Sequence, residues 1–127
     1  MYTVTVRRDF VAQHYLTVAD CGPENEWHSH HFDAEIRVRG PELDEHGYLL
    51  DITDLEAGLE TEIDRYRDAT LNDLEEFAGK NPSVEHFARI LANRVANHLE
   101  TAPLTELRCR IWEDEEAWAS YRLELSE

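Results

Sequence analysis

Three histidines and one cysteine lie close together in the first quarter of the chain. They are His14, Cys21, His28 and His30, and together they span 17 residues. Neutral imidazole is a common ligand of Zn²⁺, and three protein ligands leave a fourth tetrahedral position for water or a substrate. The set therefore predicts a catalytic zinc site. A histidine-rich surface loop is the alternative that spacing alone leaves open.

The spacing of His28 and His30 indicates the element that holds them. Residues i and i+2 of a β-strand point to the same face, so both imidazoles are expected on one side of one strand. A third ligand from a neighbouring strand can then converge with them on a single ion.

Alternating apolar and polar residues predict strands near both ends of the chain. The predicted strands cover residues 2–8, 32–39, 104–112 and 118–125. Two helices are predicted between them. Thr53-Asp-Leu-Glu56 matches a capping box at the start of the first helix, and Asn81-Pro-Ser83 begins the second.

Apolar residues recur on one side of each predicted helix. The first stripe contains Leu55, Leu59, Ile63 and Tyr66; the second contains Val84, Phe87, Ala88, Leu91, Val95 and Leu99. Two antiparallel hairpins with a helix pair between them predict a single α+β domain over residues 1–127. Its sheet is expected on one side and its helices on the other.

The charge of the chain is strongly negative. Twenty-eight acidic residues against 12 basic ones give a net charge of −16, and Lys80 is the one lysine beside eleven arginines. This composition favours a protein adapted to high salt, in which ions screen the repulsion between carboxylates. Nucleic acid is an unsuitable partner, because binding phosphates requires clustered basic residues.

No segment of the sequence predicts a membrane association. The N-terminal residues lack the pattern of a signal peptide, and no apolar stretch reaches the length of a transmembrane helix. Two cysteines 88 residues apart do not make a disulfide framework. A cytosolic location is the simplest prediction.

Arginines concentrate on the predicted strands, on the face away from the apolar residues. They are Arg7, Arg37, Arg39, Arg108, Arg110 and Arg122, and Glu35, Glu106 and Glu124 share this face. Cross-strand Arg–Glu pairs are one interpretation. An assembly interface or an anion-accepting channel is the other.

The order of several motifs resembles the 6-pyruvoyl- and 6-carboxy-tetrahydropterin synthase family. The matching segments run along nearly the whole chain: Phe10 to His14, Cys21 ahead of His28-Ser29-His30, Gly47 to Asp51, Leu71-Asn72, Asn81 to Glu85, and Glu113 with Tyr121. The resemblance implies the tunnelling fold, in which the sheets of three subunits close a barrel and two trimers stack as a hexamer.

The resemblance also implies a set of site residues and a reaction. His14, His28 and His30 would bind Zn²⁺, Glu113 would anchor the pterin as a buried carboxylate, and Cys21 as thiolate would be the general base. For Glu113, a position in the acidic run 113–116 on a solvated turn is the alternative. The substrate would be 7,8-dihydroneopterin triphosphate. The pyruvoyl-forming branch eliminates triphosphate. The carboxy-forming branch releases acetaldehyde and leads toward the deazaguanine nucleosides of transfer RNA.

One motif departs from the family. An Asp-His pair that relays protons with the cysteine is replaced here by Arg67-Asp68. Asp68 could accept a proton, but only with a retuned pKa. His86 is the best substitute candidate, with an exposed first-turn histidine as the alternative.

The departure leaves three hypotheses for function. The first is an active zinc-dependent pterin side-chain lyase with an altered acid–base set. The second is an aldolase-like lyase acting on dihydroneopterin. The third is a pterin- or metal-binding protein without turnover.

Overall fold

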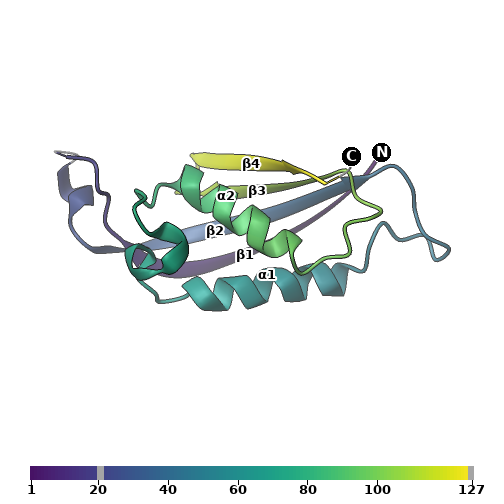
Figure 1. The fold of residues 1–127 in the computed structure, drawn as a ribbon, viewed down its shortest axis with the longest axis horizontal. Coiled ribbons are helices and arrows are strands. Elements are labelled where there is room, and N and C mark those ends of the chain that lie inside the picture. Colours follow the sequence, from purple (N-terminus) through teal and green to yellow (C-terminus); the bar gives the residue numbers. More distant parts are fainter. Residues whose placement is uncertain (20–21, 126–127) are drawn as a thin grey trace.

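Four antiparallel strands form one sheet in the order β1-β2-β3-β4. The computed structural model describes residues 1–19 and 22–125. The strands are β1 (Tyr2–His14), β2 (His28–Gly40), β3 (Glu106–Trp112) and β4 (Trp118–Glu124). Each strand pairs with the next along the chain, so β1 and β4 are the edges of the sheet (Figure 1).

Two helices cover one face of this sheet (Figure 1). They are α1 (Ile52–Tyr66), which packs on β1, and α2 (Val84–Ala96), which packs on β3 and β4. Short 3-10 turns are η1 (Gly22–Asn25), η2 (Leu71–Asp73) and η3 (Glu75–Phe77). The predicted four-stranded sheet with helices on one side is thus confirmed.

The hydrophobic core lies between the sheet and the helices. Phe10 of β1 and Phe32 of β2 both contact Phe87 of α2 edge-on, with ring centroids 5.9 and 5.4 Å apart. Every second residue of β2 from Phe32 to Val38 is buried. This alternation assigns one face of the sheet to the core and leaves the arginine-bearing face open.

The first two strands are longer than the sequence pattern predicts. The pairing of β1 with β2 is unbroken from Tyr2 opposite Gly40 to His14 opposite His28. The first predicted strand ends at residue 8 and the second begins at residue 32. The alternation is interrupted between them because Arg8 falls on the apolar face, Val11 falls on the polar face, and the histidines continue the apolar face with polar side chains. Backbone pairing continues there without the apolar signal.

Helix α1 begins earlier than predicted, and the predicted capping box is wrong. The residue before the helix is Asp51, whose carboxylate accepts a hydrogen bond of 2.8 Å from the backbone N–H of Thr53. Thr53 therefore lies inside the first turn. An Asp at this position satisfies an N–H group that has no partner within the helix.

None of the helices in the described part of the chain is long and apolar enough to cross a membrane.

Candidate metal centre

Three histidines meet where β1 ends and β2 begins. His14 is the last residue of β1 and lies opposite His28, the first residue of β2; His30 follows two residues later. One ligand atom from each imidazole lies within 4.8 Å of the other two, a group that could hold a metal ion. His14 is buried, and His28 and His30 are half-buried.

A backbone carbonyl fixes one ring nitrogen of each imidazole. Nδ1 of His14 lies 3.2 Å from the Pro82 oxygen, Nδ1 of His28 lies 2.9 Å from the Glu26 oxygen, and Nε2 of His30 lies 2.7 Å from the Glu113 oxygen. A carbonyl oxygen only accepts hydrogen bonds, so each of these nitrogens carries the proton when the ring is neutral. The opposite nitrogens then carry the lone pairs that a metal needs. They are Nε2 of His14, Nε2 of His28 and Nδ1 of His30.

Burial keeps His14 in the neutral form. The loss of solvation lowers its pKa to about 4, and the neighbouring His28 and His30 act in the same direction, while the Pro82 carbonyl partly opposes them. At neutral pH the imidazole is therefore uncharged, which is the state that binds a metal.

Two asparagines hold the chain that leaves His14. Asn72 accepts a hydrogen bond from the backbone N–H of Tyr15 (3.0 Å) and donates one to its carbonyl (2.9 Å). Asn81 accepts from the backbone N–H of Thr17 at 2.8 Å. Sequence reasoning included both residues in motifs but gave them no role, because their partners are 57 and 64 residues away along the chain.

The segment after α1 runs along β1, close to the histidines. The backbone N–H of Asp68 donates to the Val11 carbonyl, and that of Gln13 donates to the Ala69 carbonyl. Asp68 has a left-handed backbone with φ of 59°, its side chain is exposed, and it is not a member of the histidine cluster. Arg67 forms ion pairs with Glu60 and Asp64 of α1.

The other residues that the sequence proposes for the site are Glu113, His86 and Cys21. Glu113 adjoins His30 through its backbone oxygen, but its carboxylate is exposed, so the expectation of a buried anchor is not met within one chain. His86 bonds through Nδ1 to the Asn81 carbonyl at 2.6 Å, which occupies it at the start of α2. Cys21 lies outside the described residues.

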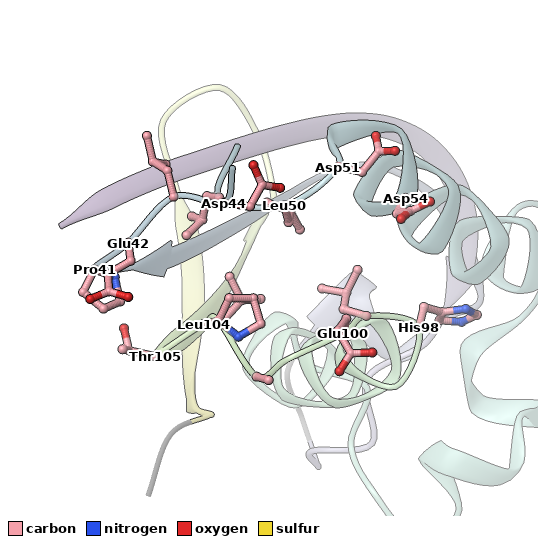
Figure 2. Close-up of a pocket in the computed structure, with 15 residues that line it drawn as sticks. Pro41, Glu42, Asp44, Leu50, Asp51, Asp54, His98, Glu100, Leu104 and Thr105 are labelled. Atoms are coloured by element: carbon pink, nitrogen blue, oxygen red, sulfur yellow. The ribbon is translucent and has the colours of Figure 1, made fainter. Parts of the chain in front are cut away.

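A cavity of about 580 Å³ lies at the other end of the sheet, between the loop after β2, the start of α1 and the segment after α2. Its wall combines buried Leu49 and Leu104 with carboxylates of Asp51, Asp54 and Glu100 (Figure 2). Among the described residues, none of those predicted for the site lines this cavity.

Several solved structures share this fold. A 6-pyruvoyl tetrahydropterin synthase of Caenorhabditis elegans is 22% identical, with 98% of each chain covered and a TM-score of 0.79. A variant of the Plasmodium vivax 6-pyruvoyltetrahydropterin synthase is 15% identical, with 97% of this chain and 98% of that chain covered and a TM-score of 0.80. A proposed dihydroneopterin aldolase of Vibrio cholerae is 12% identical, with coverage of 100% and 98% and a TM-score of 0.52.

These identities are low, so the structural matches establish the fold, which is the tunnelling fold. No curated protein sequence matches the chain. The family assignment comes instead from the sequence, since the family model described as 6-pyruvoyl tetrahydropterin synthase matches residues 3–124. With the predicted motifs, the predicted fold and this match in agreement over almost its whole length, the chain belongs to the 6-pyruvoyl tetrahydropterin synthase family.

Proposed function

We propose that this protein is a zinc-dependent lyase that acts on the side chain of a pterin, with 7,8-dihydroneopterin triphosphate as substrate. The observation that carries the proposal is the arrangement of His14, His28 and His30, in which each imidazole has one nitrogen fixed by a carbonyl and the other available to a metal. Membership of the family gives the class of substrate.

The donor set suits zinc. Zinc–nitrogen bonds of about 2.1 Å place tetrahedral ligand atoms about 3.4 Å apart. One ligand atom from each histidine lies within 4.8 Å of the other two, so zinc binding would draw the three imidazoles closer together. Bound there, zinc would supply Lewis-acid polarisation of the hydroxyl groups on the substrate side chain.

The remaining roles fall to residues of this chain. Glu113, whose backbone oxygen adjoins His30, would accept two N–H bonds from the 2-amino-pyrimidinone ring and so orient the pterin beside the histidines. Cys21, as thiolate, would take a proton from the side chain. Elimination of triphosphate would give the 6-pyruvoyl product. Side-chain cleavage with uptake of one water and release of both triphosphate and acetaldehyde would give the 6-carboxy product.

Asp68 is proposed as the replacement for part of the missing relay. Its carboxylate is exposed at the end of α1, and its backbone is hydrogen-bonded to the strand that carries His14. A carboxylate can accept and return a proton, but it lacks the two ring nitrogens with which an imidazole relays one. The altered pair Arg67-Asp68 is therefore the reason to keep an aldolase-like lyase and a binding protein without turnover as test outcomes.

Assembly and location extend the proposal. Members of the family are typically oligomeric, and β1 and β4 are sheet edges that a second copy could extend by backbone pairing. We propose a hexamer of two stacked trimers in the cytosol.

The test is incubation of the zinc-loaded protein with 7,8-dihydroneopterin triphosphate in molar salt, with products identified by mass spectrometry. A 6-pyruvoyl or 6-carboxy pterin is expected, and its formation should be lost in Cys21→Ala while zinc is retained. Glycolaldehyde released from dihydroneopterin would instead identify an aldolase-like enzyme. Tight binding without conversion of either compound would leave a binding protein.

A further inference from the structure

The open face of the sheet carries a row of arginines directly opposite one another. Arg37 of β2 pairs in register with Arg108 of β3, and Arg108 pairs in register with Arg122 of β4. Neighbouring strands lie about 4.8 Å apart, so the backbone positions of these three arginines lie within about 10 Å of one another. Like charges directly opposite each other in a sheet are destabilising unless a counter-charge lies between them.

The carboxylates beside this row do not neutralise it. Cross-strand pairs are present, but Glu106 is shared between Arg37 at 3.6 Å, Arg39 at 3.9 Å and Arg122 at 3.9 Å. The three distances to Glu106 exceed those of charge-assisted hydrogen bonds, which are about 2.8 Å. Arg122 also pairs with Glu124 of its own strand at 3.3 Å. Two negative charges, Glu106 and Glu124, therefore lie beside four positive ones, Arg37, Arg39, Arg108 and Arg122. Among the described residues, only Arg122 of these four donates a side-chain hydrogen bond to one of the two carboxylates.

Hydrogen-bond donors in the row also lack acceptors. The Nε groups of Arg37 and Arg39 are buried and, within the described residues, have no hydrogen-bond partner. Among the described residues, Arg108 forms no ion pair with any carboxylate. Oε2 of Glu106 is a buried acceptor that also lacks a hydrogen bond, but it is one atom beside several donors. Buried polar groups are nearly always satisfied, so the donors in excess of this one acceptor indicate an acceptor that comes from outside the chain.

We propose that Arg37, Arg108 and Arg122 form a binding site for a phosphate-class oxyanion, either orthophosphate or a short polyphosphate. Guanidinium groups present paired N–H donors that match phosphate oxygens bidentately. The site is a locally positive strip on a protein of net charge −16. Chloride is a single atom and lacks the several acceptor oxygens that neighbouring guanidinium groups can share, so an oxyanion is the better counter-charge.

This site is separate from the histidine cluster. Thr5 of β1 lies opposite Arg37, nine residues before His14, which corresponds to about 30 Å along an extended strand. The arginines also occupy the open face, whereas His14 lies on the side covered by the helices. A single substrate molecule does not span both, and the inference holds whether or not the proposed function is correct.

The test is calorimetric titration with orthophosphate and, separately, with tripolyphosphate, in chloride buffer of matched ionic strength. The variants are Arg108→Gln, Arg122→Gln and the control Arg89→Gln. Arg122 is well exposed on an edge strand, which makes its loss compatible with folding, and unfolding curves verify the fold of each variant. Arg89 is a half-buried arginine of α2, away from the sheet's open face.

We expect the wild-type protein and Arg89→Gln to bind alike. Arg108→Gln should weaken binding at least tenfold, and Arg122→Gln severalfold. Tighter binding of tripolyphosphate than of orthophosphate would identify a polyphosphate as the ligand, and equal binding a single phosphate group. Equal affinity in wild type and Arg108→Gln would overturn the proposal. Two results together would also overturn it: no binding by the wild-type protein, and an oligomer of Arg108→Gln whose mass differs from that of the wild-type oligomer. They would assign the row to contact between copies.

Discussion

At the scale of single residues, the histidine cluster depends on groups that do not themselves face the metal position. The carbonyls of Pro82, Glu26 and Glu113 select the tautomer of each imidazole. Asn72 and Asn81 then fix the backbone that follows His14. The geometry of the cluster is thus determined by several short contacts, most of them from distant parts of the chain.

Replacing Asn72 tests this positioning role. Asn72→Ala removes both hydrogen bonds to the Tyr15 backbone and should lower zinc affinity by roughly 10- to 100-fold, the usual effect of losing a supporting contact. Competition with a chelating dye measures the affinity. The matched control is Asn93→Ala on α2, whose amide donates to the Arg89 carbonyl of the same helix. Equal affinities in the two variants would contradict the role of Asn72.

At the scale of elements, the start of α1 depends on Asp51. Asp51→Ala should lower the free energy of unfolding by about 1 kcal/mol, because the N–H of Thr53 loses its acceptor. Thr53→Ala should cost much less, since Thr53 lies inside the helix. Urea unfolding of both variants gives the comparison. A larger loss in Thr53→Ala would restore the capping box predicted from the sequence.

The turn η3 is tied to α1 by one carboxylate. Glu76 accepts two hydrogen bonds of 2.7 Å from Arg65 and one of 2.8 Å from the hydroxyl of Tyr66. The Arg65 guanidinium is the main reason that the pKa of Glu76 falls from 4.5 to about 2. The folded state therefore favours the charged carboxylate, which stabilises the protein above pH 4.5 by at most roughly 3 kcal/mol.

This linkage predicts the pH dependence of one substitution. Wild type should be more stable than Glu76→Gln above pH 4.5, and the difference should shrink as the pH falls from about 4.5 to about 2, where Glu76 becomes protonated even in the folded state. Urea unfolding of both proteins across this range isolates Glu76, because the other carboxylates titrate in both. A difference independent of pH would contradict the assignment.

The sequence predicted the elements well and their ends less well. Periodicity identified all four strands and both helices, because each buries one regular apolar face. It missed the last part of β1, where Arg8 and Val11 interrupt the alternation, and it missed the start of β2, for which the i, i+2 spacing of His28 and His30 was the one strand signal. Residue type and spacing identified the three histidines. They did not identify the carbonyls and asparagines that orient them, since most of those contacts are set by tertiary structure.

At the scale of the whole molecule, net charge opposes folding. A charge of −16 on 127 residues produces self-repulsion that salt screens, with a Debye length of about 10 Å at 0.1 M falling to about 3 Å at 1 M. Raising sodium chloride from 0.1 M to 1 M should therefore raise the midpoint of thermal unfolding by several degrees. An unchanged or lower midpoint would contradict adaptation to high salt.

A zinc titration of the metal-free protein tests the proposed zinc site and the proposed activity together, with both bound zinc and converted 7,8-dihydroneopterin triphosphate as readouts. It is made on wild type, on His30→Ala and on His31→Ala, whose neighbouring imidazole lies on the opposite, open face of β2 and pairs with Asp9. We expect wild type and His31→Ala to bind one zinc per chain, with the amount of product rising in proportion to bound zinc. We expect His30→Ala to lose both zinc binding and product formation. Full zinc binding or undiminished turnover in His30→Ala would contradict the proposal.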